Sequence, residues 1–258
     1  MQLSEFFNKH KKIALSFSGG VDSAYLLYAA SKANIDVVAY YVKSEFQPEF
    51  ELEDAKRLAK ELGACFRIIE FSPFEANDEE VLSNPSNRCY YCKKNIMGLI
   101  KNEARKDGYQ EIMDGTNASD IVDDRPGVRA LEELKICSPL RECGLTKDMI
   151  RTASKEAGLF TWNKASYACL ATRIQTGIRL SKEDLSTTEK CEGFLAELGY
   201  YDFRIRMRYI PGETGMIKRG LVQVKKEQKD KLLMDERTIL EELSKSYDEV
   251  VFDKEYRS

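Results

Sequence analysis

The sequence contains a single histidine and no excess of either charge. That residue, His10, lies in a charged stretch near the start of the chain, where a solvated surface position is expected. A mechanism that depends on a histidine base is therefore not expected. The 258 residues include 40 basic and 43 acidic side chains, a net charge of −3 without a nucleic-acid signature. We expect no nucleic-acid partner.

The chain also lacks an apolar run long enough to span a membrane, and its first residues do not resemble a secretory signal. We therefore expect a cytoplasmic protein with no membrane partner. Apolar residues make up 43% of the chain, which is enough for a sizeable core. In a reducing compartment, seven cysteines favour thiols, metal ligands or reactive groups over disulfides.

The segment Ser-Gly-Gly-Val-Asp-Ser follows a short apolar run and precedes a helix-like stretch. A strand that ends in two glycines and becomes a helix presents unpaired backbone N–H groups to an anion. The serine hydroxyls can add donors, and the aspartate can hold a divalent metal that bridges phosphates. The segment lacks the Gly-Lys-Ser/Thr ending of a nucleoside-triphosphatase loop, so hydrolysis of a γ-phosphate is not expected. The candidate phosphate-binding residues are Ser18, Gly19, Gly20, Val21, Asp22 and Ser23.

Apolar and helix-like segments alternate over the first 70 residues. The pattern predicts strands at 12–17, 36–42 and 65–70, with helices at 21–32 and 49–62 between them. This alternation predicts an α/β fold with a doubly wound parallel sheet, whose ligands bind at the carboxyl ends of the strands. The phosphate-binding segment follows the first strand and therefore lies at that edge.

The remaining segments are shorter. We expect loops at 75–88 and 160–180, a turn at 125–127, and a small α+β domain from 181 to 258 after a larger domain of residues 1–180. The expected helices are 3–10, 92–106, 128–134, 146–157, 181–198 and 227–243, and the expected strands are 111–115, 135–138, 203–208, 221–224 and 249–252.

Three cysteines are candidates for chemistry. Cys89 and Cys92 form a Cys-x-x-Cys pair, which alone fits a redox pair, half of a zinc site or two cluster ligands. Cys169 is the third candidate, and three thiolates with an open fourth position suit a 4Fe-4S cluster. Packing is expected of Cys65 and Cys191, and it is favoured over chemistry for Cys137 and Cys143, which have no assigned role.

With these residues in view, nearly the whole chain resembles the LarE-type ATP-dependent sulfur transferases of nickel-pincer cofactor biosynthesis, associated with lactate racemase maturation. They belong to the PP-loop superfamily of adenylating enzymes, which have an adenine nucleotide alpha hydrolase-like fold. The matching segments are residues 18–23, 88–93, 114–117, 124–129, 138–140, 168–174 and 204–206.

The resemblance implies that the protein adenylates a carboxylate of pyridinium-3,5-dicarboxylate mononucleotide and converts it to a thiocarboxylate. Some family members give up the sulfur of one cysteine, at the position of Cys169, and retain dehydroalanine. Others have three cysteines and hold a 4Fe-4S cluster that delivers sulfide catalytically. Because this chain has Cys89, Cys92 and Cys169, the resemblance favours the cluster version, with ATP, Mg²⁺, a sulfur donor and a homo-oligomeric assembly.

The resemblance also assigns roles to arginines. Arg204 and Arg206 share one face of a predicted strand, and the family's pattern makes them ligands of the substrate phosphate. From the spacing alone, a solvated strand face fits equally well. Arg173 is expected to hold either the substrate or the cysteine loop. The candidate catalytic residues are Asp22, Cys169 and Arg173.

Two glutamates and one glutamine also bear on a metal or substrate site. Glu189 and Glu192 are candidates for a metal or substrate site, but a solvated helix surface is the favoured interpretation of both. Gln223 stands where the family tends to have an acidic residue, which argues against a metal ligand there. The alternative functions are a tRNA thiolase, disfavoured by the net charge, an ammonia-dependent amidating enzyme, and a nucleotide sensor or iron–sulfur carrier without turnover.

Overall fold

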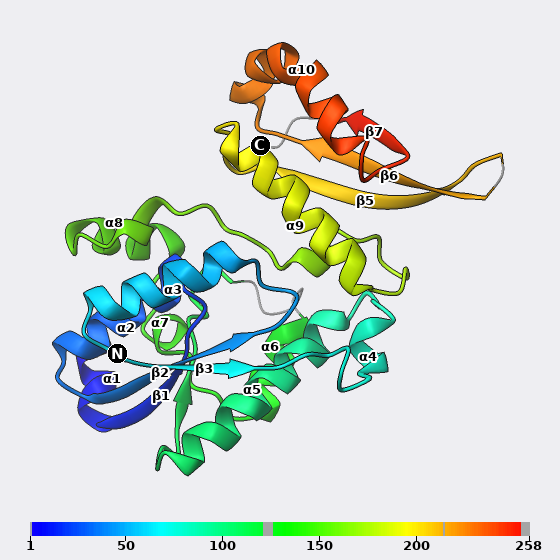
Figure 1. Ribbon diagram of the computed structural model, residues 1–258. Coiled ribbons are helices and arrows are strands. Elements are labelled where there is room, and N and C mark those ends of the chain that lie inside the picture. Colours follow the sequence, from blue (N-terminus) through cyan, green and yellow to red (C-terminus); the bar gives the residue numbers. More distant parts are fainter. Residues whose placement is uncertain (1, 121–125, 214, 254–258) are drawn as a thin grey trace. The chain divides into compact units, whose positions relative to one another are not determined.

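The computed structural model describes residues 2–120, 126–213 and 215–253. Contacts within the chain divide it into two compact units (Figure 1). The first unit comprises Met1–Ser44, Glu49–Ser72 and Asn87–Lys164, and the second comprises Glu45–Pro48, Pro73–Ser86 and Ala165–Ser258. The division into functional domains at residue 180 stays a prediction.

The first unit contains a four-stranded parallel sheet, in the order β3-β2-β1-β4. Its strands are β1 (Lys12–Ser16), β2 (Asp36–Lys43), β3 (Cys65–Glu70) and β4 (Ile112–Met113). The chain builds outward from β1 to β3 and then returns to the other side of β1. Ligands of such sheets bind at the carboxyl ends of the strands where this reversal occurs, here β1 and β4.

Helices cover both faces of this sheet, so the predicted doubly wound α/β fold is confirmed (Figure 1). Side chains of β1 alternate, with Ile13 and Leu15 packing in one core and Ala14 in the other. The helices of the unit are α1 (Leu3–Lys9), α2 (Val21–Lys32), α3 (Glu49–Glu61), α5 (Arg88–Lys106), α6 (Pro126–Glu133), α7 (Pro139–Glu142), α8 (Lys147–Glu156) and the 3-10 helix η1 (Phe160–Asn163). No helix in the described part of the chain is long and apolar enough to cross a membrane.

The second unit contains a three-stranded sheet and its helices, which confirms a small α+β fold after the larger sheet. Strand β5 (Arg204–Pro211) pairs antiparallel with β6 (Met216–Gln223), which pairs parallel with β7 (Glu249–Phe252). The helices are α4 (Glu79–Leu82), α9 (Lys182–Glu197) and α10 (Lys229–Leu243), with the 3-10 helices η2 (Leu170–Thr172) and η3 (Lys226–Gln228). Because Ile205 and Met207 are fully buried, the arginines that alternate with them share the other face of β5.

Several predicted elements differ from the structure. The expected strand at 135–138 is only a single bridge between Met113 and Cys137. The helix expected from Cys92 begins at Arg88, and the loop expected at 75–88 contains α4. Pro126 begins α6 instead of forming a turn, since proline suits the first position of a helix. Asp124 and Arg125 belong to the matching segment 124–129, and Arg125 also to the turn expected at 125–127. Both residues lie outside the described residues.

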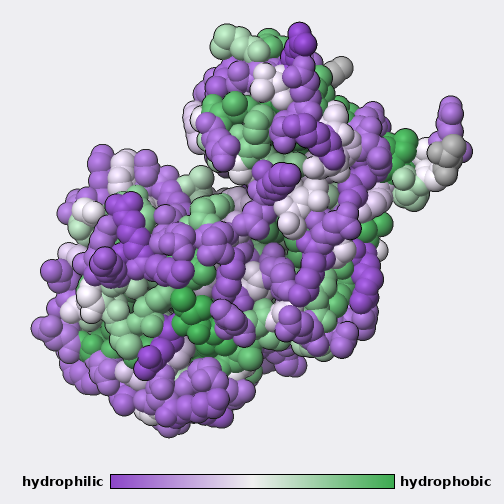
Figure 2. Space-filling view, viewed as in Figure 1, coloured by the Kyte–Doolittle hydropathy of each residue, from purple (hydrophilic) through white to green (hydrophobic). Residues whose placement is uncertain are grey.

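The surface shown in Figure 2 is mainly hydrophilic, with apolar patches between the polar side chains. This distribution agrees with a chain in which charged residues make up 32%. Cys65 is exposed, so the expectation that it packs in the core is wrong. It lies on β3, the edge strand of the sheet, and strand order is not readable from a local pattern. Cys191 is buried, as expected.

Candidate active site

The Ser-Gly-Gly-Val-Asp-Ser segment joins β1 to α2 at the carboxyl edge of the parallel sheet. Gly19 has a φ of +72°, in the left-handed region, and a Cβ at this position would lie 3.1 Å from the Cβ of Ala55. Only glycine adopts this conformation here without strain. Gly20 is the N-cap residue of α2 and has no side chain, so it leaves the first N–H groups of the helix without a cap of its own. Such a helix start favours an anion.

The two serines of the loop hold its shape. Ser23 is buried, and its hydroxyl donates to the carbonyl oxygen of Gly20 at 3.2 Å. The hydroxyl oxygens of Ser18 and Ser23 are 3.1 Å apart, and the backbone N–H of Ser18 donates to Ser23 Oγ at 3.3 Å. The hydroxyls therefore close the turn from within, and their contact with a phosphate stays a prediction.

Asp22 meets two segments that are distant in the sequence. The Nζ of Lys147 is 2.6 Å from Asp22 Oδ2, and Asn117 Nδ2 donates to Asp22 Oδ1 at 3.3 Å. Asn117 follows β4, and Lys147 is the first residue of α8, after its N-cap Thr146. Lys147 was not a candidate from the sequence. The sequence contains one indication of such a role. A lysine in the first turn of a helix is unfavourable, because its charge is repelled by the positive end of the helix dipole.

Asp114 organises the segment that carries Asn117. Its side chain is only 3% exposed and accepts hydrogen bonds from Thr116 Oγ1 at 2.6 Å and Ser138 Oγ at 2.8 Å. The ammonium group of Lys93, on α5, lies 3.6 Å from Asp114 Oδ2. Buried carboxylates need such partners. The network fixes the end of β4 next to the loop between β1 and α2.

Gly115 brings that segment directly against the start of α2. A Cβ built at Gly115 would lie 2.9 Å from the backbone nitrogen of Ser23, closer than side chains tolerate. The close approach therefore requires glycine.

Gly115→Ala is expected to lower the free energy of unfolding by about 1–3 kcal/mol, because the added methyl group overpacks this contact. Urea denaturation measures the change. Gly98→Ala is the matched control, because a Cβ there meets nothing within 4 Å and alanine favours the helix. A Gly115→Ala protein as stable as Gly98→Ala would contradict the close approach.

The predicted thiolates lie in different units. Cys89 and Cys92 are three residues apart in the first turns of α5 and share one helix face, with Cys89 exposed. Cys169, in the second unit, is the N-cap residue of η2. Among the residues that the structure describes, no three His, Cys, Asp or Glu side chains form a metal-binding group. The three-cysteine cluster site stays a prediction.

Cys137 and Cys143 are half-buried. Burial raises the pKa of the Cys137 thiol to about 11, and it also raises the pKa of Cys143. A thiol with a raised pKa holds its proton at neutral pH and is a poor nucleophile. This environment favours packing over chemistry for both cysteines.

Arg173 and Glu192 form a buried ion pair in the second unit. Arg173 is 1% exposed and Glu192 is 4% exposed. The guanidinium binds both carboxylate oxygens, with Nε to Oε1 at 2.7 Å and Nη2 to Oε2 at 3.1 Å. Its Nη1 donates to the carbonyl oxygen of Ala168, so Arg173 holds the cysteine loop. The expectation of a solvated Glu192 is wrong because its partner, 19 residues earlier, is not apparent from the helix pattern. Glu189 is half-buried.

The environment of Arg173 also involves the cysteine. Burial alone would lower the pKa of Arg173, but the hydrogen bonds and charge of Glu192 raise it on balance, with smaller contributions from Tyr167 and Cys169. The Arg173 guanidinium therefore stays protonated in this buried pair.

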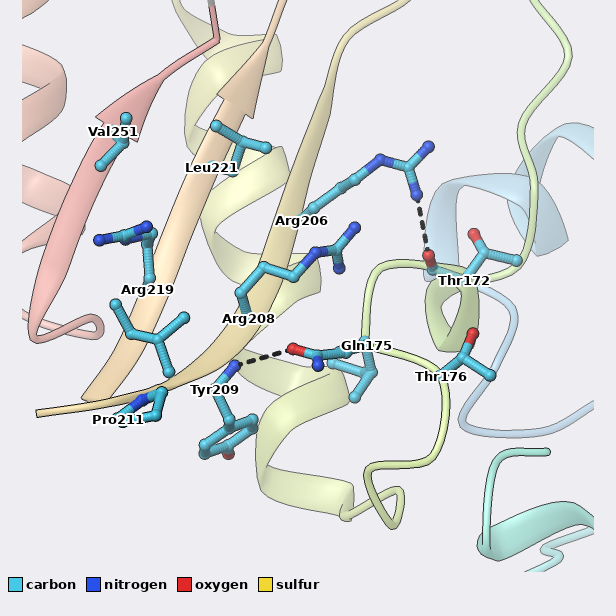
Figure 3. Close-up of a pocket in the computed structure, with 12 residues that line it drawn as sticks. Thr172, Gln175, Thr176, Arg206, Arg208, Tyr209, Pro211, Arg219, Leu221 and Val251 are labelled. Carbon is cyan, nitrogen blue, oxygen red and sulfur yellow. Dashed lines mark hydrogen bonds between the residues drawn. The ribbon is translucent and has the colours of Figure 1, made fainter. Parts of the chain in front are cut away.

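A cavity of about 730 Å³ lies in the second unit (Figure 3). Arg206 and Arg208 both point toward the loop that carries Thr172 and Thr176, whereas Arg219 points away from it (Figure 3). Arg219 pairs with Glu249. Arg204 is not among the described residues that line this cavity. Its contact with a substrate phosphate stays a prediction.

The two central arginines of the cavity have different partners. Arg206 donates to Gln223 Oε1 at 2.7 Å and to the carbonyl oxygen of Thr172 at 3.2 Å. Arg208 donates to the carbonyl oxygens of Met207 and Arg173, and burial lowers its pKa. Two neighbouring guanidinium groups in a cavity form a site suited to an anion.

Comparisons with known proteins agree with this description. No family model matches the chain. An uncharacterised protein of Synechocystis is 33% identical over 207 residues, which are 79% of this chain and 76% of that protein. The pyridinium-3,5-bisthiocarboxylic acid mononucleotide synthase of Lactiplantibacillus plantarum is 29% identical over 198 residues, 76% of this chain and 71% of that protein. A tRNA-specific 2-thiouridylase of Pseudothermotoga lettingae is 28% identical over 193 residues, 60% of this chain and 54% of that protein.

The parallel sheet, the glycine-containing loop at the carboxyl end of β1 and the similarity to a 2-thiouridylase together place the chain in the PP-loop class. Within that class, the chain belongs to the LarE-type family.

Proposed function

We propose that the protein is an ATP-dependent sulfur transferase, which adenylates a carboxylate of pyridinium-3,5-dicarboxylate mononucleotide and converts it to a thiocarboxylate. The observation that carries the proposal is the meeting of Asp22, Asn117 and Lys147 at the start of α2. A phosphate-binding helix start, an ammonium group and a carboxylate are the groups that bind a metal-bound triphosphate. The name of the relative from Lactiplantibacillus plantarum supplies the substrate class.

In the adenylation step, the N–H groups at the start of α2 bind the phosphates, and Lys147 neutralises their charge. Asp22 offers carboxylate oxygens, which fit Mg²⁺. When bound, Mg²⁺ stabilises the charge that develops on the departing phosphates. An oxygen of the substrate carboxylate bonds to the α-phosphorus, the bond from that phosphorus to the bridging oxygen breaks, and pyrophosphate leaves. Electrostatic stabilisation of the leaving group supplies most of the rate.

In the second step, sulfur displaces AMP from the acyl carbon. We propose Cys89, Cys92 and Cys169 as thiolate ligands of a 4Fe-4S cluster, since three thiolates leave one iron open to sulfide. The shared helix face of Cys89 and Cys92 fits two ligands of one cluster. In the alternative route, the Cys169 thiolate forms a thioester with the substrate. Loss of the cysteine α-proton and cleavage of the Cβ–Sγ bond then give the thiocarboxylate and dehydroalanine.

Iron and sulfide counting after anaerobic purification, followed by the mass of the chain after turnover, separates these routes. An unchanged chain mass with bound iron and sulfide supports the cluster. A chain lighter by one hydrogen sulfide, located at Cys169, supports the sacrificial route.

We propose that the substrate phosphate binds in the cavity of the second unit. Arg206 and Arg208 supply charge there. Arg204 lies on the same face of β5, and we propose that it assists from outside the cavity lining. Guanidinium groups bind phosphate through paired, charge-assisted hydrogen bonds.

Arg206→Gln should raise KM for the pyridinium nucleotide about 10- to 100-fold. This change corresponds to the free energy of one charge-assisted hydrogen bond. KM for ATP should not change, because ATP is proposed to bind in the first unit. Steady-state pyrophosphate release gives both constants. Arg237→Gln is the control, since Arg237 is an exposed residue of α10 that pairs with Glu241. If both variants have the same KM for the pyridinium nucleotide, Arg206 does not bind the substrate.

A tRNA thiolase is the second candidate, and the similarity to a 2-thiouridylase favours it. The net charge of −3 argues against it, because tRNA binding requires a basic face. Tight tRNA binding that weakens steeply with salt would reverse our preference.

We further propose a cytoplasmic homo-oligomer with a small-molecule substrate, and light scattering after size-exclusion chromatography measures the oligomeric state.

A further inference from the structure

The carboxylate of Glu192 is fully engaged within the second unit. Its Oε1 accepts from Arg173 Nε at 2.7 Å and from the backbone N–H of Ile205 at 2.9 Å. Its Oε2 accepts from the hydroxyl of Tyr167 at 2.6 Å and from Arg173 Nη2 at 3.1 Å. We call Glu192, Tyr167, Arg173 and the N–H of Ile205 the Glu192 network. One side chain on α9 thus connects a loop to β5.

The residues of this network lie on both sides of Cys169. Tyr167 precedes the cysteine by two residues, and Arg173 follows it by four. The guanidinium of Arg173 also lies 4.6 Å from the centre of the Tyr167 ring. The loop from Tyr167 to Arg173 is therefore fixed at both ends by the same carboxylate.

Stability alone does not account for this arrangement. A buried ion pair adds little net free energy, because removing two charges from water offsets their attraction. Hydrogen bonds to four donors do fix geometry, since each donor restricts the position of the carboxylate and of its own backbone. The segment fixed in this way carries one thiol, that of Cys169.

We propose that Glu192 is a positioning residue, which fixes the thiol of Cys169 through Tyr167 and Arg173. The reason to hold the sulfur in place rests on the proposed function, since sulfur transfer is what requires it. The fixing of the loop by Glu192 does not depend on that function. Glu192 acts on the second chemical step only, because its partners surround the cysteine and the adenylation residues lie in the first unit.

The test uses Tyr167→Phe in the full-length protein, which removes one hydroxyl and keeps the ring against Arg173. Tyr200→Phe is the matched control, since Tyr200 is a buried tyrosine of the same unit whose hydroxyl donates to Asp235. Hydrogen exchange of residues 167–173 should become at least about tenfold faster in Tyr167→Phe and stay unchanged in the control.

Partial reactions give the second measurement. Tyr167→Phe should reduce single-turnover formation of the thiocarboxylate about 10- to 100-fold, because small displacements of a reacting atom cost rates of this order. Substrate-dependent pyrophosphate release should keep the wild-type rate. Glu192→Gln should reproduce both effects, and Glu192→Asp, which retains the charge, should restore part of the sulfur transfer.

The outcomes separate this proposal from the proposed function. Unchanged hydrogen exchange in Tyr167→Phe would overturn the proposal, as would faster exchange with unchanged sulfur transfer. An equal loss of both partial reactions would also overturn it, because the network would then act on the whole fold. If the wild-type protein releases no pyrophosphate, the proposed function fails, and hydrogen exchange still decides whether Glu192 fixes the loop.

Discussion

Replacing Lys147 by methionine should lower substrate-dependent pyrophosphate release by about 100- to 1,000-fold, the usual effect of removing one preorganised electrostatic group. The ammonium of Lys147 lies 2.6 Å from Asp22 at the start of α2. Methionine keeps the length and apolar stem of the side chain and removes its charge. The variant therefore loses stabilisation of the charge on the leaving pyrophosphate. The rate is measured at saturating ATP, so that a change in affinity does not obscure it.

Lys155→Met is the matched control for this experiment. Lys155 lies in the last turn of the same helix, α8, and its ammonium group is over the ring of Trp162. This variant should retain the wild-type rate. If Lys147→Met also retains it, Lys147 only orients Asp22 in the free protein and takes no part in adenylation.

Replacing Cys169 by alanine should reduce thiocarboxylate formation at least about 1,000-fold, as expected for loss of a group that bonds to the reacting atoms. Substrate-dependent pyrophosphate release should continue, because adenylation uses the residues around Asp22. Both sulfur routes require the Cys169 sulfur, either as a cluster ligand or as the sulfur that is transferred. Mass spectrometry of the nucleotide product measures the first quantity, and a pyrophosphate assay measures the second.

Cys65→Ala is the control, since Cys65 is an exposed cysteine on β3 with no role in the account. Unchanged product formation in Cys169→Ala would contradict sulfur transfer through this residue. An amide product, formed equally well by wild-type protein and Cys169→Ala, would favour the ammonia-dependent alternative, which needs no cysteine.

The sequence predicts the sheet of the first unit well, because its signals are local. The apolar run of β1, the two glycines and the start of α2 are adjacent in the chain, and each restricts the backbone directly. The same holds for Thr146 and Ser181, which cap α8 and α9 through their side chains. Short elements are predicted less accurately. The strand expected at 111–115 is present as β4 but has only two residues, and a single bridge replaces the strand expected at 135–138.

The contacts that complete the candidate site are long-range, and a single sequence does not reveal them. Lys147 is 125 residues from Asp22. Glu192 follows a helix pattern that looks solvated until its partner, Arg173, is known. The burial of an ionisable side chain depends on what it pairs with, and periodicity reports only which face of a helix is apolar. Lys147 and Glu192 therefore had weak signals in the sequence, although both make long-range contacts in the candidate site.

The central claim is that a nucleotide carboxylate is activated as an acyl adenylate and then receives sulfur. The most direct test incubates the anaerobically purified protein with ATP, Mg²⁺, sulfide and pyridinium-3,5-dicarboxylate mononucleotide, and quantifies all products. The account predicts equal amounts of pyrophosphate, AMP and thiocarboxylate, with none of the three formed when the nucleotide substrate is omitted. Cleavage of ATP to ADP and phosphate, or pyrophosphate release without a sulfur-containing product, would contradict it.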